Sequence, residues 1–166
     1  MNDLWGVVLT IVLLAANAFF VGAEFALIAA RRDRLIALEE AGKKRARTVI
    51  RASENLSLML AGSQLGITIC SILLGRIGEP AIAHLIEKPL EWAHVPHGFL
   101  HPIGFTLALT LVVILHILLG EMVPKNIALA GPERAAMLLI PTHLFLIRLM
   151  RPIIWMYNAL ANGGLR

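Results

Sequence analysis

The sequence lacks the features that enzymes and disulfide-bonded proteins usually show. It contains a single cysteine, Cys70, so no disulfide can form within the chain. It has no HExxH, GxSxG or P-loop pattern, and the corresponding hydrolases and nucleoside triphosphatases depend on those residues. Its opening residues, MNDLWG, carry no basic charge, which argues against a cleavable signal peptide. We therefore expect a protein that is not an enzyme and that keeps its N-terminal segment.

Charged residues are also absent from three long stretches. They cover residues 4–23, 56–75 and 102–120, and each is close to the roughly 20 residues with which a helix crosses a membrane. Of all residues, 58% are hydrophobic, above the roughly 45–50% that is usual for soluble domains. The sequence therefore predicts an all-α integral membrane protein. Three transmembrane helices are expected, at about residues 4–28, 56–78 and 102–130.

A fourth apolar segment, residues 135–147, is expected to lie on the membrane rather than across it. It is shorter than the other three and contains Pro141 and His143, so it fits a membrane-surface helix better than a span. The other expected segments are an external loop at about residues 84–101, a belt of juxtamembrane helices at 132–160, and the start of a linker at 161–166.

Basic residues cluster between the first two predicted spans, in residues 31–54. Membrane topology explains the net charge of +4 better than a nucleic-acid partner does, because cytoplasmic loops carry an excess of Lys and Arg. We therefore expect amphipathic juxtamembrane helices in the cytoplasm here, with the N-terminus outside and the C-terminus inside. No nucleic-acid partner is expected. The cluster consists of Arg31, Arg32, Arg34, Lys43, Lys44, Arg45, Arg47 and Arg51.

Glu121 directly follows the third charge-free stretch, and Pro124 comes three residues later. Since proline has no N–H, the carbonyl of Gly120 loses its helical donor, and we expect a kink with Pro124 as its hinge. The Glu121 carboxylate and the Gly120 carbonyl would then lie together as oxygen donors for a hard cation. Acidic residues inside membrane spans are often functional. The alternative is that Glu121 reaches the cytoplasmic surface and pairs with Lys125.

The first span contains a second acid, Glu24, which also has two interpretations. It could be an ion ligand, because an ionisable residue inside a span is costly and usually functional. It could instead pair with Arg31, Arg32 or a backbone donor at the inner surface, since it lies only one to two turns before the two arginines. Two neutral polar residues, Asn17 and His116, are interpreted as contacts between helices rather than as ligands.

The second span carries neutral polar side chains in the stretch AGSQLGITICS. Among them are Ser63, Gln64 and Ser71, and the residues at 64, 68 and 71 share one helix face. This face could line a cavity against Glu121, or it could form ordinary hydrogen bonds between helices. The glycine pair in the same stretch, Gly62 and Gly66, allows a close approach by another helix.

These residues match a known pattern. The stretch GEMVPKNIALA at residues 120–130 resembles the Gly-Glu-x-x-Pro-Lys signature of the transmembrane domain of the CorC/CNNM (cyclin M) family. The resemblance extends to NAFFVGAEFALIAARRDRL in the first span and GSQLGITICSILLGRIGEPAIA in the second. It covers essentially the whole chain.

The resemblance implies a homodimer in the plasma membrane, with three transmembrane helices in the lipid bilayer, an intramembrane kink and a juxtamembrane belt. The expected function is export of Mg²⁺ from the cytoplasm, with Na⁺ entry as the driving force. Full-length members continue into a cytosolic CBS pair. Two alternatives remain: a membrane anchor or sensor that controls another transporter, or transport of a different cation.

The resemblance also implies an ion site. It maps the third-span glutamate to Glu121 and the second-span serine to Ser71, and paired asparagines of the family appear here as Ser63 and Gln64. Serines that often precede the first-span glutamate are replaced by Val21-Gly22-Ala23. The Gly22 backbone carbonyl or the Glu24 carboxylate would have to take their place, and Gly22 is a second expected hinge.

Overall fold

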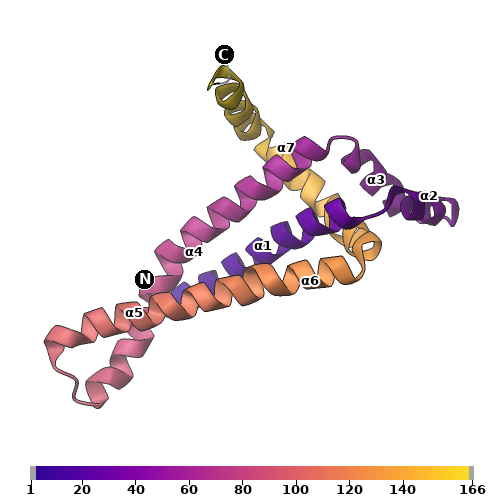
Figure 1. Cartoon of the computed structure of the whole chain (residues 1–166). Helices are drawn as coiled ribbons and strands as arrows, with labels where there is room; N and C mark the ends of the chain where they lie inside the picture. The colour runs from indigo at the N-terminus through magenta and orange to yellow at the C-terminus, as the bar shows by residue number, and fades with distance from the viewer. Residues whose placement is uncertain (1–2, 165–166) are drawn as a thin grey trace. The chain divides into compact units, whose positions relative to one another are not determined.

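A computed structural model describes residues 3–164, and nearly all of them are helical (Figure 1). The described residues are 92% helix and contain no strand. The helices are α1 (Asp3–Ala29), α2 (Arg32–Glu40), α3 (Lys44–Ser53), α4 (Leu56–Trp92), α5 (His97–Leu115), the π-helix η1 (His116–Met122), α6 (Val123–Ala130) and α7 (Pro132–Gly164). The predicted all-α class is therefore confirmed.

Four helical segments of the described chain are long and apolar enough to cross a membrane, where the sequence predicts three. The additional one belongs to α7, whose helix continues through Pro141 and Pro152 instead of ending there. Length and composition alone thus do not single out three spans. The four segments are Leu4–Ala29, Leu56–Trp92, Gly98–Ala130 and Pro132–Met156.

The prediction of an external loop over residues 84–101 is wrong for most of that range. Helix α4 continues to Trp92 and α5 begins at His97, so the connection is only residues 93–96. The turn contains His94 with a φ of 58°, in the left-handed region, and Pro96 precedes the first residue of α5. Leu, Glu and Lys are good helix formers, which explains why the segment HLIEKPLEW stays helical.

The expected linker start at 161–166 also differs from the structure. Residues 161–164 continue α7, and residues 165 and 166 lie outside the described residues.

The segment predicted as juxtamembrane, residues 31–54, contains two short helices with Gly42 between them. Gly42 has a φ of +87°, which glycine adopts without a steric penalty. The N–H of Lys43 donates to the carbonyl of Leu38 at 3.0 Å, and the N–H of Gly42 donates to Glu39 at 2.9 Å. These two bonds satisfy carbonyls at the end of α2 and form a Schellman C-cap, so the chain can turn and begin α3.

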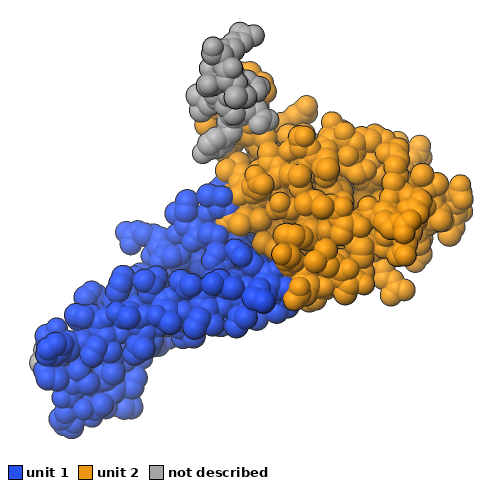
Figure 2. Space-filling view, viewed as in Figure 1, with its two compact units in different colours: residues 1–18, 68–123 blue, residues 19–67, 124–166 orange. Residues whose placement is uncertain are grey.

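The chain forms two compact units, which Figure 2 shows in blue and orange. Unit 1 comprises residues 1–18 and 68–123, and unit 2 comprises residues 19–67 and 124–166. Helices α1 and α4 each contribute to both units, and the chain passes from unit 1 to unit 2 between Val123 and Pro124.

Unit 2 has the larger apolar core. Helices α2 and α3 pack on each other and α3 packs on α7, with Val49 and Ile140 fully buried among them. The glycine pair of α4 permits close packing, as predicted. A Cβ on Gly66 would lie 2.6 Å from the Phe20 ring, and one on Gly62 would lie 2.6 Å from Ile147. Any larger side chain at these two positions would therefore force the Phe20 or Ile147 side chain to move.

Unit 1 has a small core and an apolar exterior. Its buried cluster consists of Leu14, Leu74 and Val112, while large apolar residues such as Ile11 and Ile72 are 60% and 66% exposed. A water-soluble surface rarely presents so continuous an apolar area. This unit therefore has the surface of a membrane-embedded helix bundle.

Candidate functional site

The site begins with a π-helical segment at the end of the long helix that starts with α5. Segment η1 runs from His116 to Met122, and Pro124 is the second residue of α6. A π-helix bonds residue i to residue i+5 and appears mostly as a single turn, often at a functional site. Because Pro124 cannot donate to the Gly120 carbonyl, the backbone here needs another donor.

Asn17 of α1 supplies that donor. Its Nδ2 donates to the carbonyl oxygen of Gly120 at 3.0 Å, and both residues are buried. The expectation of a free Gly120 carbonyl therefore needs correction, because a side chain occupies it. The other amide atom, Asn17 Oδ1, is buried and has no hydrogen-bond partner among the described residues. Such an orphan acceptor costs about 1–3 kcal/mol, and a bound cation would remove that cost.

His116 joins η1 to α4 and to the carboxylate of Glu121. Its Nε2 lies 3.2 Å from Oγ of Ser71 and 3.9 Å from Oε1 of Glu121. His116 and Glu121 are five residues apart, the spacing that a π-helix brings onto one face. The Glu121 side chain is 51% exposed in the isolated chain, and that of His116 is 21% exposed.

The close packing of this cluster requires glycine at position 120, because a side chain there would crowd its neighbours. A Cβ there would lie 2.8 Å from Cδ2 of His116, closer than real Cβ contacts allow, and 3.0 Å from Nδ2 of Asn17, tighter than most real Cβ contacts. The structure thus brings three predicted ligands, Gly120, Glu121 and Ser71, together with two residues for which the sequence predicts only contacts between helices. The cluster consists of Asn17, Ser71, His116, Gly120 and Glu121, all in unit 1.

The donor set of this cluster consists mainly of oxygen. A carboxylate, a hydroxyl, an amide oxygen and a backbone carbonyl are the ligands that hard cations such as Mg²⁺ prefer. The described residues contain no group of three or more His, Cys, Asp and Glu side chains that could hold a metal ion. Neutral oxygen donors would therefore make up most of any coordination shell here.

Ser63, a predicted ligand, is engaged elsewhere in unit 2. Its Oγ forms a 2.9 Å hydrogen bond with Nε2 of His143, and both side chains are fully buried. The rings of Phe19 and Phe20 lie beside His143, with centroids 6.3 and 6.0 Å from its ring. Of the two interpretations for Ser63, a hydrogen bond between helices therefore fits the structure.

We predict that Ser63→Ala destabilises unit 2 without weakening ion binding. The change leaves His143 without its one hydrogen bond, since its Nδ1 already has no partner among the described residues. The expected loss is about 1–3 kcal/mol, measurable as a lower thermal unfolding midpoint. Ser57→Ala, at an exposed position, is the control. A normal midpoint combined with weaker Mg²⁺ binding would instead assign Ser63 to the ion.

Glu24 lies half-buried in α1, and its side chain has no hydrogen bond or ion pair among the described residues. The alternative interpretation, a pairing with Arg31 or Arg32, is not seen among the described residues, because both arginines lie beside other acids. Arg31 binds Asp33 at 2.7 Å, and its guanidinium lowers the pKa of that carboxyl. Arg32 lies 3.7 Å from Glu54. A ligand role for Glu24 stays a prediction.

The remaining predicted residues also belong to unit 2. Gln64 is exposed on α4, and Gly22 lies inside uninterrupted α1, where a Cβ would meet Leu139 at 3.2 Å. Lys125, the alternative partner of Glu121, places its Nζ 4.7 Å from the centroid of the Phe25 ring. It makes no ion pair in the described part of the chain. The ligand role of Gln64 and the hinge roles of Gly22 and Pro124 stay predictions.

The comparisons with known proteins point to one family. A family model described as "Cyclin M transmembrane N-terminal domain" matches residues 8–166. A Mycobacterium tuberculosis (strain H37Rv) protein described as uncharacterized is 60% identical over 166 residues, which are 100% of this chain and 47% of that protein.

Two Bacillus subtilis (strain 168) proteins are similar over almost the whole chain. UPF0053 protein YhdT is 39% identical over 163 residues, 98% of this chain and 35% of that protein. UPF0053 protein YhdP is 36% identical over 156 residues, 94% of this chain and 35% of that protein. The chain thus spans about half the length of the mycobacterial relative and about a third of these two.

Proposed function

The chain belongs to the cyclin M (CNNM) transmembrane family, and from this premise we propose that it transports Mg²⁺ across the membrane. The observation that carries the proposal is the cluster in unit 1. The Glu121 carboxylate, the Ser71 hydroxyl and the orphan Oδ1 of Asn17 gather beside a π-helical turn within an apolar bundle. An apolar environment makes such groups expensive unless an ion or partner satisfies them.

Each member of the cluster has a distinct task in this proposal. Glu121 supplies the negative charge that compensates for the ion's lost hydration. Ser71 and Asn17 supply neutral oxygens, and the Gly120 carbonyl can supply another, because it has a second lone pair beside the one that accepts from Asn17. Neutral ligands let the ion leave as readily as it enters. His116 contacts both Ser71 and Glu121, so it is a positioning residue that sets the distance between the two ligands.

We propose three spans and a juxtamembrane α7, rather than four spans. Helix α7 packs against α3, and α3 carries Lys44, Arg45, Arg47 and Arg51 within ten residues. Four basic side chains on one short helix do not fit into the hydrocarbon core, since each costs about 2.5–3.5 kcal/mol there. The length of α7 that contacts α3 therefore lies at the membrane surface. With α2 and α3 in the cytoplasm, the N-terminus is outside.

The proposal has four further parts. They are export from the cytoplasm, Na⁺ entry as the driving force, a homodimer in the plasma membrane and a cytosolic CBS pair. These four parts rest on the family resemblance. Since the mycobacterial relative is about twice as long as the chain, a regulatory segment beyond residue 166 is compatible with them. The chain is proposed to be a transporter and not an enzyme.

The test is ion flux into liposomes that contain the purified protein and a Mg²⁺ indicator. We expect a Mg²⁺ gradient to drive flux above that of empty liposomes, and an opposing Na⁺ gradient to change its rate. Parallel measurements with Ca²⁺ and Mn²⁺ identify a different cargo. If no cation moves, the transport proposal fails. The alternative of a membrane-anchored sensor, which the missing first-span serines favour, then takes its place.

A further inference from the structure

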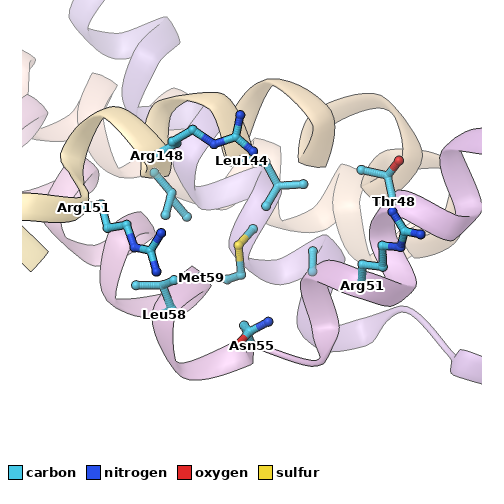
Figure 3. A pocket seen from close by; sticks show the side chains of 10 residues that line it. Thr48, Arg51, Asn55, Leu58, Met59, Leu144, Arg148 and Arg151 are labelled. Carbon is cyan, nitrogen blue, oxygen red and sulfur yellow. The ribbon is translucent and has the colours of Figure 1, made fainter. Parts of the chain in front are cut away.

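Unit 2 contains a cavity of about 450 Å³ lined by three arginines. Arg51 comes from the end of α3, whereas Arg148 and Arg151 come from α7 (Figure 3). Thr48 and Asn55, with a hydroxyl and an amide, line the same cavity. The size lies in the usual range of ligand pockets, about 300–1,000 Å³. The cavity is therefore large enough for a small anionic group and strongly positive.

None of these three arginines has an ion pair in the described part of the chain. Four other arginines of unit 2 do form an ion pair, so acidic partners are available in this unit. Three like charges around one cavity repel each other, and an anion between them would relieve that repulsion. The four paired arginines are Arg31 with Asp33, Arg32 with Glu54, Arg34 with Glu133 and Arg47 with Glu39.

The rest of the cavity wall is apolar. Met59 is 1% exposed, and it lines the cavity with Leu58 of α4 and Leu144 of α7. In Figure 3 the side chain of Met59 lies between Arg51 and Arg151. A ligand that matches both the basic and the apolar residues of the cavity has a compact anionic group and an apolar chain. A free, fully hydrated anion would leave the apolar part of the wall unused.

The cavity also lies at the start of a candidate span. Leu58 and Met59 belong to the first turn of α4, directly after the basic helix α3. A span that begins after a basic segment enters the membrane from the cytoplasmic leaflet, which holds the anionic lipids. Arginine binds phosphate oxygens in a bidentate manner.

We propose that this cavity binds the phosphate of an anionic phospholipid, with the acyl chains against its apolar wall. This site is separate from the cluster around Glu121 and does not depend on whether the protein moves Mg²⁺. A bound lipid would hold α3, α4 and α7 together, because all three line the cavity.

The experiment measures the thermal unfolding midpoint of the full-length, delipidated protein in detergent. Dioleoylphosphatidylglycerol, dioleoylphosphatidylcholine and sodium phosphate are added separately. A ligand that binds the folded state raises the midpoint. We expect phosphatidylglycerol to raise it at concentrations at least about tenfold lower than phosphatidylcholine does, a difference of about 1.4 kcal/mol in binding. Sodium phosphate alone should have no such effect.

Two triple variants test whether the preference for phosphatidylglycerol depends on the three arginines of the cavity. Arg51→Gln/Arg148→Gln/Arg151→Gln should lose the preference for phosphatidylglycerol, whereas Lys43→Gln/Lys44→Gln/Arg45→Gln, with the same change in charge, should keep it. If the arginine triple does not fold, Arg148→Gln alone should show a partial loss. Three results would overturn the proposal: no preference in the unaltered protein, an equal loss in both triples, or an equal response to sodium phosphate, which would indicate a site for a soluble anion.

Discussion

Glu121→Gln is expected to lower Mg²⁺ transport in liposomes at least about tenfold, the effect of losing about 1.4 kcal/mol of ion binding. Glutamine keeps the size of the side chain and one carbonyl oxygen, so the change removes the negative charge and little else. Glu121 is the one acidic member of the cluster, and its neighbours offer neutral oxygens and an imidazole. Without its charge, a divalent cation would lose hydration with no compensating anion.

Glu91→Gln is the matched control, because Glu91 is an exposed acid in the last turn of α4. It removes the same charge from the same unit but lies outside the cluster. Transport should be normal in this variant. Isothermal titration of Mg²⁺ into both variants separates binding from movement. Unchanged binding and transport in Glu121→Gln would refute the assignment of Glu121 as a ligand.

The helical membrane class could be predicted because it depends on composition over long stretches. Charge-free stretches of 19–20 residues have few alternatives to a membrane helix, and the first of them lies within α1. Helix ends are harder to predict, and most of the loop expected over residues 84–101 is helical. Pro80 and Pro89 lie inside α4, and Pro141 and Pro152 lie inside α7. A proline interrupts one hydrogen bond, and the rest of a long apolar helix tolerates it.

The site could be predicted only where one residue carries a strong signal. Glu121 is an acid directly after an apolar run, and Pro124 indicates that the Gly120 carbonyl lacks its helical donor. Asn17 and His116 were missed as members of the cluster for two different reasons. Asn17 joins it through a contact 103 positions away in the sequence. His116 joins it through the i, i+5 spacing of a π-helix, whereas sequence patterns are judged by α-helical spacing.

Ser63 and Ser71 show why spacing alone did not separate ligand from structural contact. Both are serines of α4 with a histidine within hydrogen-bond distance, His143 for Ser63 and His116 for Ser71. Ser63 and its partner are fully buried, whereas Ser71 and its partner are partly exposed, and an acid lies beside only the second pair. Burial and the nearby carboxylate are tertiary properties, which the sequence pattern does not contain.

Gly120→Ala is expected to abolish transport while the helices still form. The added methyl group would lie 2.8 Å from Cδ2 of His116 and 3.0 Å from Nδ2 of Asn17, so both side chains must move. That movement breaks the hydrogen bond between Asn17 and the Gly120 carbonyl and shifts His116 away from Ser71. Overpacking of this kind costs about 1–3 kcal/mol. The larger effect is on function, because a compact site requires its ligands to be held within about 0.5 Å of the productive geometry.

Gly75→Ala is the control for this change, since a Cβ at Gly75 would meet no atom within 4 Å. Gly75 lies in α4, in the same unit as Gly120, and alanine favours helix more than glycine does. This variant should transport normally and unfold at the same or a higher temperature. The two variants therefore differ in the crowding of the cluster and not in the chemistry of the substitution. Equal transport by Gly120→Ala and Gly75→Ala would mean that the ion does not pass the cluster of Asn17, His116 and Glu121.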